Sequence, residues 1–146
     1  MRELMPVLGA LLRVTIRLSI GKLKQPAHRR ALTAAMRRMR ASAAAADANS
    51  FHLAGIEYAA ALRRAAGNRY LDYLDGKLYA ELFYPQTSAA VTILDWNAHL
   101  AHFEAMHRAL LTGDLQRALT LIDEHEQWML AALEGESARS AVNPSR

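Results

Sequence analysis

Helix-breaking and helix-capping residues recur along this 146-residue chain at intervals that suit helices. Gly21 ends a first apolar segment, Asp47 precedes a later one, and the pairs at 67–68 and 113–114 interrupt the chain again. Between these breaks alanine and leucine dominate, and long segments lack the alternation of β-branched residues that is typical of strands. The pattern predicts an all-α protein, an antiparallel bundle of about six helices.

The same breaks set the expected boundaries. A chain of 146 residues is long enough to bury one hydrophobic core, so we expect a single domain over 1–134. The small, polar residues of 135–146 predict a flexible tail. The expected helices cover 2–20, Pro26 to 46, Asp47 to 66, 70 to Pro85, Thr87 or Ser88 to Thr112, and 115 to 134.

Basic residues outnumber acidic ones by four, and many of them lie between 28 and 40. Their spacing places several on one flank of a helix, opposite apolar residues such as Leu32 and Met36. A solvated helix face explains this arrangement better than a phosphate-binding surface, because no aromatic residues alternate with the arginines.

The first twenty residues are apolar but contain Arg2, Arg13 and Arg17, and no small-residue cleavage site follows them. We therefore expect neither a signal peptide nor a membrane span, and a cytoplasmic location. The sequence contains no cysteine, which excludes disulfides and thiolate chemistry.

Five short segments carry patterns whose order matters as much as their content. The first opens the chain with Arg-Glu-Leu, and the second leads from an acidic and aromatic start into a glycine-containing helix. The third is a Gly-Asn pair, the fourth ends in Thr-Gly-Asp, and the fifth ends in Asp-Glu-His. In order they cover 2–11, 47–59, 67–68, 102–114 and 114–125.

Together these segments resemble the FCD domain, the ligand-sensing domain of GntR-type bacterial transcription regulators, over nearly the whole chain. In that family one Asp and three His hold a divalent metal, which in turn binds a carboxylate effector. The resemblance puts Gly55 at the Asp position, Ala59 and Phe103 at two His positions, and His125 at the third. One imidazole is too few ligands for a metal, so we expect neither a metal nor another cofactor here.

The resemblance also places Met5 and Gly9 where the family carries Arg and Glu. These substitutions predict a pocket that is larger and more apolar than the family's, which suits a small hydrophobic or aromatic effector. His125 is expected to donate or accept a hydrogen bond to that effector. The expected ligand-binding residues are Met5, Gly9, Gly55, Ala59, His99, Phe103 and His125.

Three alternatives stay open at this stage. The substitutions can fill the cavity and leave a scaffold that senses nothing. The domain can instead be an enzyme, in which His125 or His99 acts as general acid or base on a small substrate. His52, His99 and His102 can form a displaced metal site if their helices run in the same direction. His107 is expected at a helix surface.

Family members carry a winged-helix domain before this one, and that domain contacts DNA. The resemblance implies that this chain contacts DNA only through such a domain, which its own residues do not include. It also implies a homodimer, because the helical domain mediates dimerisation in the family.

Overall fold

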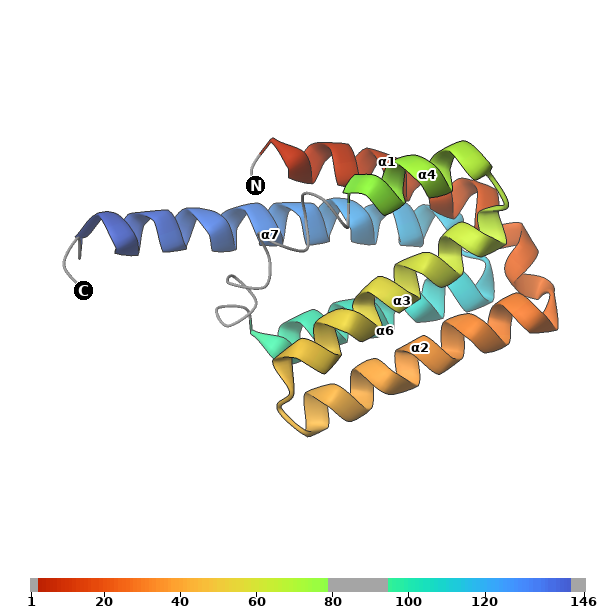
Figure 1. Cartoon of the computed structure of the whole chain (residues 1–146), viewed down its shortest axis with the longest axis horizontal. Helices are drawn as coiled ribbons and strands as arrows, with labels where there is room; N and C mark the ends of the chain where they lie inside the picture. The colour runs from red at the N-terminus through yellow and green to blue at the C-terminus, as the bar shows by residue number, and fades with distance from the viewer. Residues whose placement is uncertain (1–2, 79–94, 143–146) are drawn as a thin grey trace.

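The computed structural model describes residues 3–78 and 95–142. Side chains are described only up to residue 132, and those of residues 75 and 96 are not described. This part of the chain holds α-helices, one 3-10 helix and no strand, so the predicted all-α bundle is confirmed (Figure 1). The helices are α1 (Leu4–Ser19), η1 (Ile20–Lys24), α2 (Pro26–Ala44), α3 (Ala48–Ala66), α4 (Arg69–Lys77), α6 (Trp96–Thr112) and α7 (Leu115–Val142).

Two helix boundaries differ from the sequence prediction. The helix α6 begins at Trp96, because the Asp95 side chain caps it by accepting from the backbone N–H groups of Asn97 and Ala98 at 3.0 and 3.1 Å. The expected start at Thr87 or Ser88 lies outside the described residues, as does the expected helix end at Pro85. The last helix, α7, continues to Val142, past the predicted end at 134.

The helices form two antiparallel hairpins, and α1 lies alongside α7 of the second hairpin (Figure 1). The first hairpin is α2 and α3, which make the most extensive helix contact in the described chain. The second is α6 and α7, joined at Gly113, whose left-handed φ of 77° suits glycine and ends α6. Helix α1 packs along α7 in the opposite direction and also contacts α3 and α4.

The core lies where the two hairpins and α1 meet, and it is built from apolar side chains at helical spacing. Helix α2 contributes one continuous stripe, and α3 ends at Gly67, whose φ of 64° lets the chain turn away. Of the described helices, every one except α4 contributes to this core. Its fully buried larger side chains include Ile16, Leu32, Met36, Met39, Tyr58, Leu62 and Leu110.

One described segment, Leu4–Lys24, is long and apolar enough to cross a membrane by length and composition. Its inner side belongs to the bundle, because Ile16 and Ser19 are fully buried there. Its outer side exposes Val7, Val14 and Leu18. The helix that meets these criteria of length and composition therefore packs against the bundle on one side.

Candidate functional site

The candidate site lies where α6 and α7 face each other. His99, His102 and Phe103 follow one another at helical spacing on α6, so they share one side of that helix. The hairpin turn at Gly113 brings that side against His125 of α7. The Nε2 atoms of His99 and His125 lie 3.0 Å apart, which is a hydrogen-bond distance.

Ring stacking extends this pair into a cluster. The ring of His102 stacks on His125 with centroids 4.5 Å apart and planes 24° apart. Trp128, one helical turn beyond His125, contacts the rings of both His99 and His125, at 5.3 and 5.8 Å. The ring of Trp128 thus lies against both imidazoles from the α7 side.

Helix α3 closes the cluster from a third side. Phe51 lies 5.5 Å from the His99 ring, and Tyr58 meets Phe103 edge to face at 5.6 Å. Such pairs stabilise packing beyond the area they bury. We call this set the histidine cluster, and it consists of Phe51, Tyr58, His99, His102, Phe103, His125 and Trp128.

Burial keeps the imidazoles of the cluster neutral at pH 7. Desolvation, followed by the nearby His102 and His52, lowers the pKa of His99 to about 4. Desolvation and then His99 and His102 hold the pKa of His125 well below its usual value. One of the two facing Nε2 atoms can therefore carry the proton and donate to the other. The cluster offers uncharged donors, acceptors and aromatic faces.

A second buried imidazole corrects the sequence prediction. His107 was expected at a helix surface, but it is only 6% exposed, and its Nδ1 lies 3.3 Å from the Tyr58 hydroxyl. Burial, reinforced by Arg40 and Arg29, lowers its pKa to about 4. The spacing of four residues from Phe103 puts His107 on the inward side of α6, and this signal was available in the sequence.

The structure brings together three of the seven predicted ligand-binding residues, His99, Phe103 and His125. The sequence prediction did not include their neighbours Phe51, Tyr58 and Trp128 as site residues. Trp128 follows His125 by three residues, so helical spacing alone places it on the same side. His52 is close enough to His99 to affect its pKa, which agrees with α3 and α6 running in the same direction (Figure 1).

The other four predicted residues lie on α1 and α3, and their ligand role stays a prediction. Met5 is buried, and Ala59 is half-buried. A Cβ atom on Gly55 would meet only the Met39 side chain, at 3.9 Å, on the α2 side. A Cβ on Gly9 would come within 2.3 Å of Glu126 Oε2, so glycine here permits the close approach of α7.

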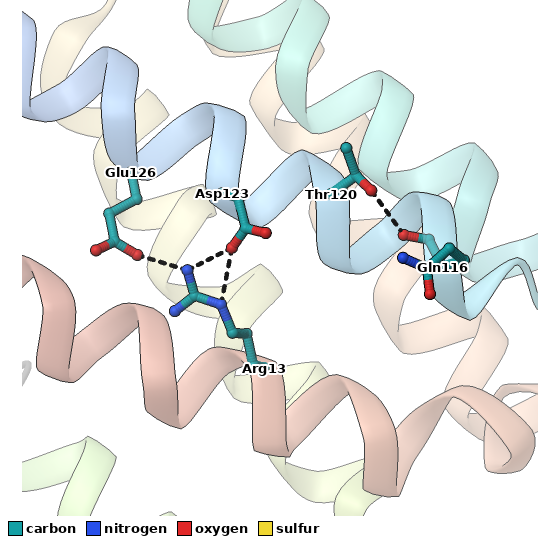
Figure 2. Close-up of polar contacts among 5 residues, drawn as sticks. All are labelled: Arg13, Gln116, Thr120, Asp123 and Glu126. Carbon is teal, nitrogen blue, oxygen red and sulfur yellow. Dashed lines mark hydrogen bonds and ion pairs between the residues drawn. The ribbon is translucent and has the colours of Figure 1, made fainter.

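Polar contacts of Arg13 fix α1 to α7 (Figure 2). The Arg13 Nε donates to Asp123 Oδ1 at 2.9 Å, and Arg13 also donates to Glu126 Oε2 at 2.8 Å. On the neighbouring turn of α7, Thr120 donates to the Gln116 carbonyl at 3.0 Å. Asp123 and Glu126, which flank His125 in the sequence, are therefore both paired with Arg13 of α1.

The donor set does not fit the metal that the family pattern implies. Gly55, Ala59 and Phe103 carry no ligating atom, which leaves His125 as the one ligand at the family's positions. No group of three or more His, Cys, Asp or Glu side chains is arranged to hold a metal among residues 3–78 and 95–132 for which side chains are described. The displaced set of His52, His99 and His102 is not so arranged either.

Comparison with family models gives one match, described as the FCD domain, over residues 3–127. No curated protein and no solved structure matches the chain. The matched range includes α1, α2, α3, α4, α6 and the part of α7 that carries His125.

Proposed function

Because the chain belongs to the FCD family, we propose that it is the effector-binding and dimerisation domain of a GntR-type transcription regulator. The proposed effector is a small hydrophobic or aromatic molecule, bound without a metal. DNA is contacted through a winged-helix domain rather than by this helical bundle, and the protein acts in the cytoplasm.

The observation that carries the proposal is the histidine cluster. His125 stands at the one position where the family's ligand set is kept, and it lies against the imidazoles of His99 and His102 and the rings of Phe103 and Trp128. Neutral imidazoles can donate or accept a hydrogen bond, and the rings of Phe103 and Trp128 suit a flat or apolar ligand. Polar recognition at one point with apolar contact elsewhere is the common form of a small-molecule site.

The position of the cluster also supports a regulatory role. It joins α3, α6 and α7, so a ligand that separates the facing His99 and His125 rings acts on the packing of both hairpins. A ligand shifts an equilibrium only by its difference in affinity for two states. In this proposal the favoured state sets the distance between two attached DNA-binding domains.

The test combines metal analysis with a ligand screen on the purified protein. We expect substoichiometric zinc, nickel, iron and manganese, and a raised Tm with benzoate, phenylacetate or hexanoate. A ligand at a hundred times its Kd adds about 2.7 kcal/mol to the free energy of unfolding, so the shift is several degrees.

Two variants separate the site from a general effect of the ligand. His125→Ala removes the proposed hydrogen-bonding group and is expected to reduce the shift with acids. The matched control His28→Ala removes an imidazole on α2, away from the cluster, and is expected to keep it. Stoichiometric metal, or equal shifts in both variants, would contradict the proposal.

A further inference from the structure

The outer side of α1 carries apolar residues that the bundle does not use. Val7, Val14 and Leu18 are 48%, 46% and 40% exposed, although they lie on the helix whose other side enters the core. Among the described residues, most of the large exposed apolar side chains lie on α1 and its neighbour α4 (Figure 1). Concentrated exposure of this kind is typical of an interaction surface.

The spacing of these residues is that of a helix packed against another helix. Leu4, Val7, Leu11, Val14 and Leu18 are separated alternately by three and four residues, which is the repeat of a coiled-coil seam. The seam extends over about 21 Å of the helix axis. Leu4 and Leu11 are half-buried, and the other three are exposed, so the seam is open to a partner helix.

The residue types along the seam are the same read in either direction: Leu, Val, Leu, Val, Leu. An antiparallel second copy centred near Leu11 places Leu4 beside the partner's Leu18 and Val7 beside the partner's Val14. A two-fold interface needs this self-complementarity, because the same surface must serve both subunits.

One flank of the seam carries an acidic residue at one end and a basic residue at the other, so two antiparallel copies of this flank are complementary in charge. Glu3, Ala10 and Arg17 follow one another at seven-residue intervals and are all exposed. In the antiparallel arrangement Glu3 faces the partner's Arg17, and Ala10 lies near the two-fold axis. In a parallel arrangement the flanks of the two copies would lie on opposite sides of the seam, so Glu3 and Arg17 would not meet. Neither Glu3 nor Arg17 forms an ion pair within the part of the chain that the structure describes.

We propose that two copies of this chain associate through antiparallel packing of α1 on α1, with Glu3 and Arg17 paired across the two-fold axis. The inference rests on the dimerisation included in the proposed function and names the surface that carries it. A membrane is a poorer partner for this helix, because its inner side and Arg13 are already engaged by the bundle.

The first test is a charge reversal and its rescue, followed by sedimentation equilibrium on the full chain. Arg17→Glu creates two repulsive pairs per dimer and is expected to weaken dimerisation roughly tenfold. Glu3→Arg is expected to do the same, and the double variant Glu3→Arg/Arg17→Glu to restore the dimer. Arg37→Glu makes the same charge change at an exposed position of α2 and is expected to have no effect.

The register of the two α1 helices can be tested separately by cysteine cross-linking, because the sequence contains no native cysteine. Ala10→Cys is expected to form a disulfide-linked dimer on mild oxidation, because the two copies of position 10 meet near the axis. The control Arg37→Cys is expected to remain unlinked at the same protein concentration. Val14→Lys is expected to give a folded monomer, because Val14 lies outside the core.

The outcomes separate this inference from the proposed function. A wild-type monomer, or a dimer that Val14→Lys and Arg17→Glu leave unchanged, would overturn the pairing of α1. A wild-type monomer that co-sediments with vesicles of phosphatidylcholine and phosphatidylglycerol would assign the seam to a membrane instead. Effector binding measured by thermal shift in the Val14→Lys monomer would leave the ligand site standing in either case.

Discussion

The space between α2 and α3 and the space between α6 and α7 are both buried, but different chemistry fills them. Between α2 and α3 the contact is made by apolar side chains such as Leu32, Met36 and Leu62. Between α6 and α7 the imidazoles of His99 and His125 meet at hydrogen-bond distance under aromatic rings. The first contact is stabilised by the burial of apolar side chains. The stability of the second also depends on the protonation state of its imidazoles.

This difference bears on where regulation can occur. An apolar core responds to the size of a side chain and has no state that a proton or a small polar ligand can change. A cluster of neutral imidazoles can change its protonation state. Each added proton places a charge in a buried site close to other imidazoles, which is unfavourable. We therefore expect the two regions to respond differently to substitution and to pH.

The largest expected effect comes from a cavity in the apolar region. Leu32 is fully buried, so Leu32→Ala should cost about 2–5 kcal/mol in the free energy of unfolding. Because no titrating group is involved, the cost should be the same at pH 7.5 and pH 5.5. Urea unfolding at both values measures it, with Leu74→Ala as the control at a 50% exposed position. A cost that changes strongly with pH would break the comparison.

Acid should weaken the imidazole region selectively. The pKa values of His99 and His107 fall from 6.5 to about 4 on folding, so the unfolded state takes up protons first. Their stabilising contribution is complete above pH 6.5 and is lost as the pH falls toward 4. For the buried His107 alone the loss between pH 6.5 and 5 is on the order of 2 kcal/mol. Urea unfolding at closely spaced pH values gives this slope.

A variant assigns the acid effect to the cluster. His99→Gln removes one titrating imidazole, so the slope of stability against pH between 6.5 and 5 should become shallower than in the wild type. Leu32→Ala should lower the whole curve without changing its slope. If His99→Gln leaves the slope unchanged, the cluster does not govern the response to acid.

Helical spacing in the sequence predicted much of the fold but less of the difference between the apolar α2–α3 contact and the imidazole-containing α6–α7 contact. Capping at Asp47 and the breaks at Gly67 and Gly113 are local, and each stands where the sequence placed it. The burial of His107 depends on Tyr58, 49 residues away in the chain, and local spacing gave only the side of the helix. The meeting of His99 with His125 needed the angle between two helices, which periodicity does not supply.

Loss of the hydrogen bond between Tyr58 and His107, which lies between the two regions, should have an intermediate effect on the free energy of unfolding. Tyr58→Phe keeps the ring that packs on Phe103 and removes only the hydroxyl. The His107 Nδ1 then loses its partner in a buried place, at a cost of about 1–2 kcal/mol. Thermal unfolding at pH 7.5 measures this cost, with Tyr70→Phe as the control at an exposed position. Equal stability of both variants would show that the hydroxyl contact is not formed.

The smallest expected change is at Gly9, where two effects of similar size oppose each other. Alanine stabilises a helix interior over glycine by about 0.5–1 kcal/mol, whereas its Cβ would displace the Glu126 carboxylate from Arg13. A partly exposed ion pair contributes at most about 1 kcal/mol, so Gly9→Ala alone should be nearly neutral. In a Glu126→Ala background the closest contact left is with Arg13 Nη1, at 2.8 Å, which is the far end of a flexible side chain, so the same substitution should stabilise the protein by up to about 1 kcal/mol. Thermal unfolding of the four proteins completes this cycle, and additivity of the two substitutions would show that Gly9 is not there to admit Glu126.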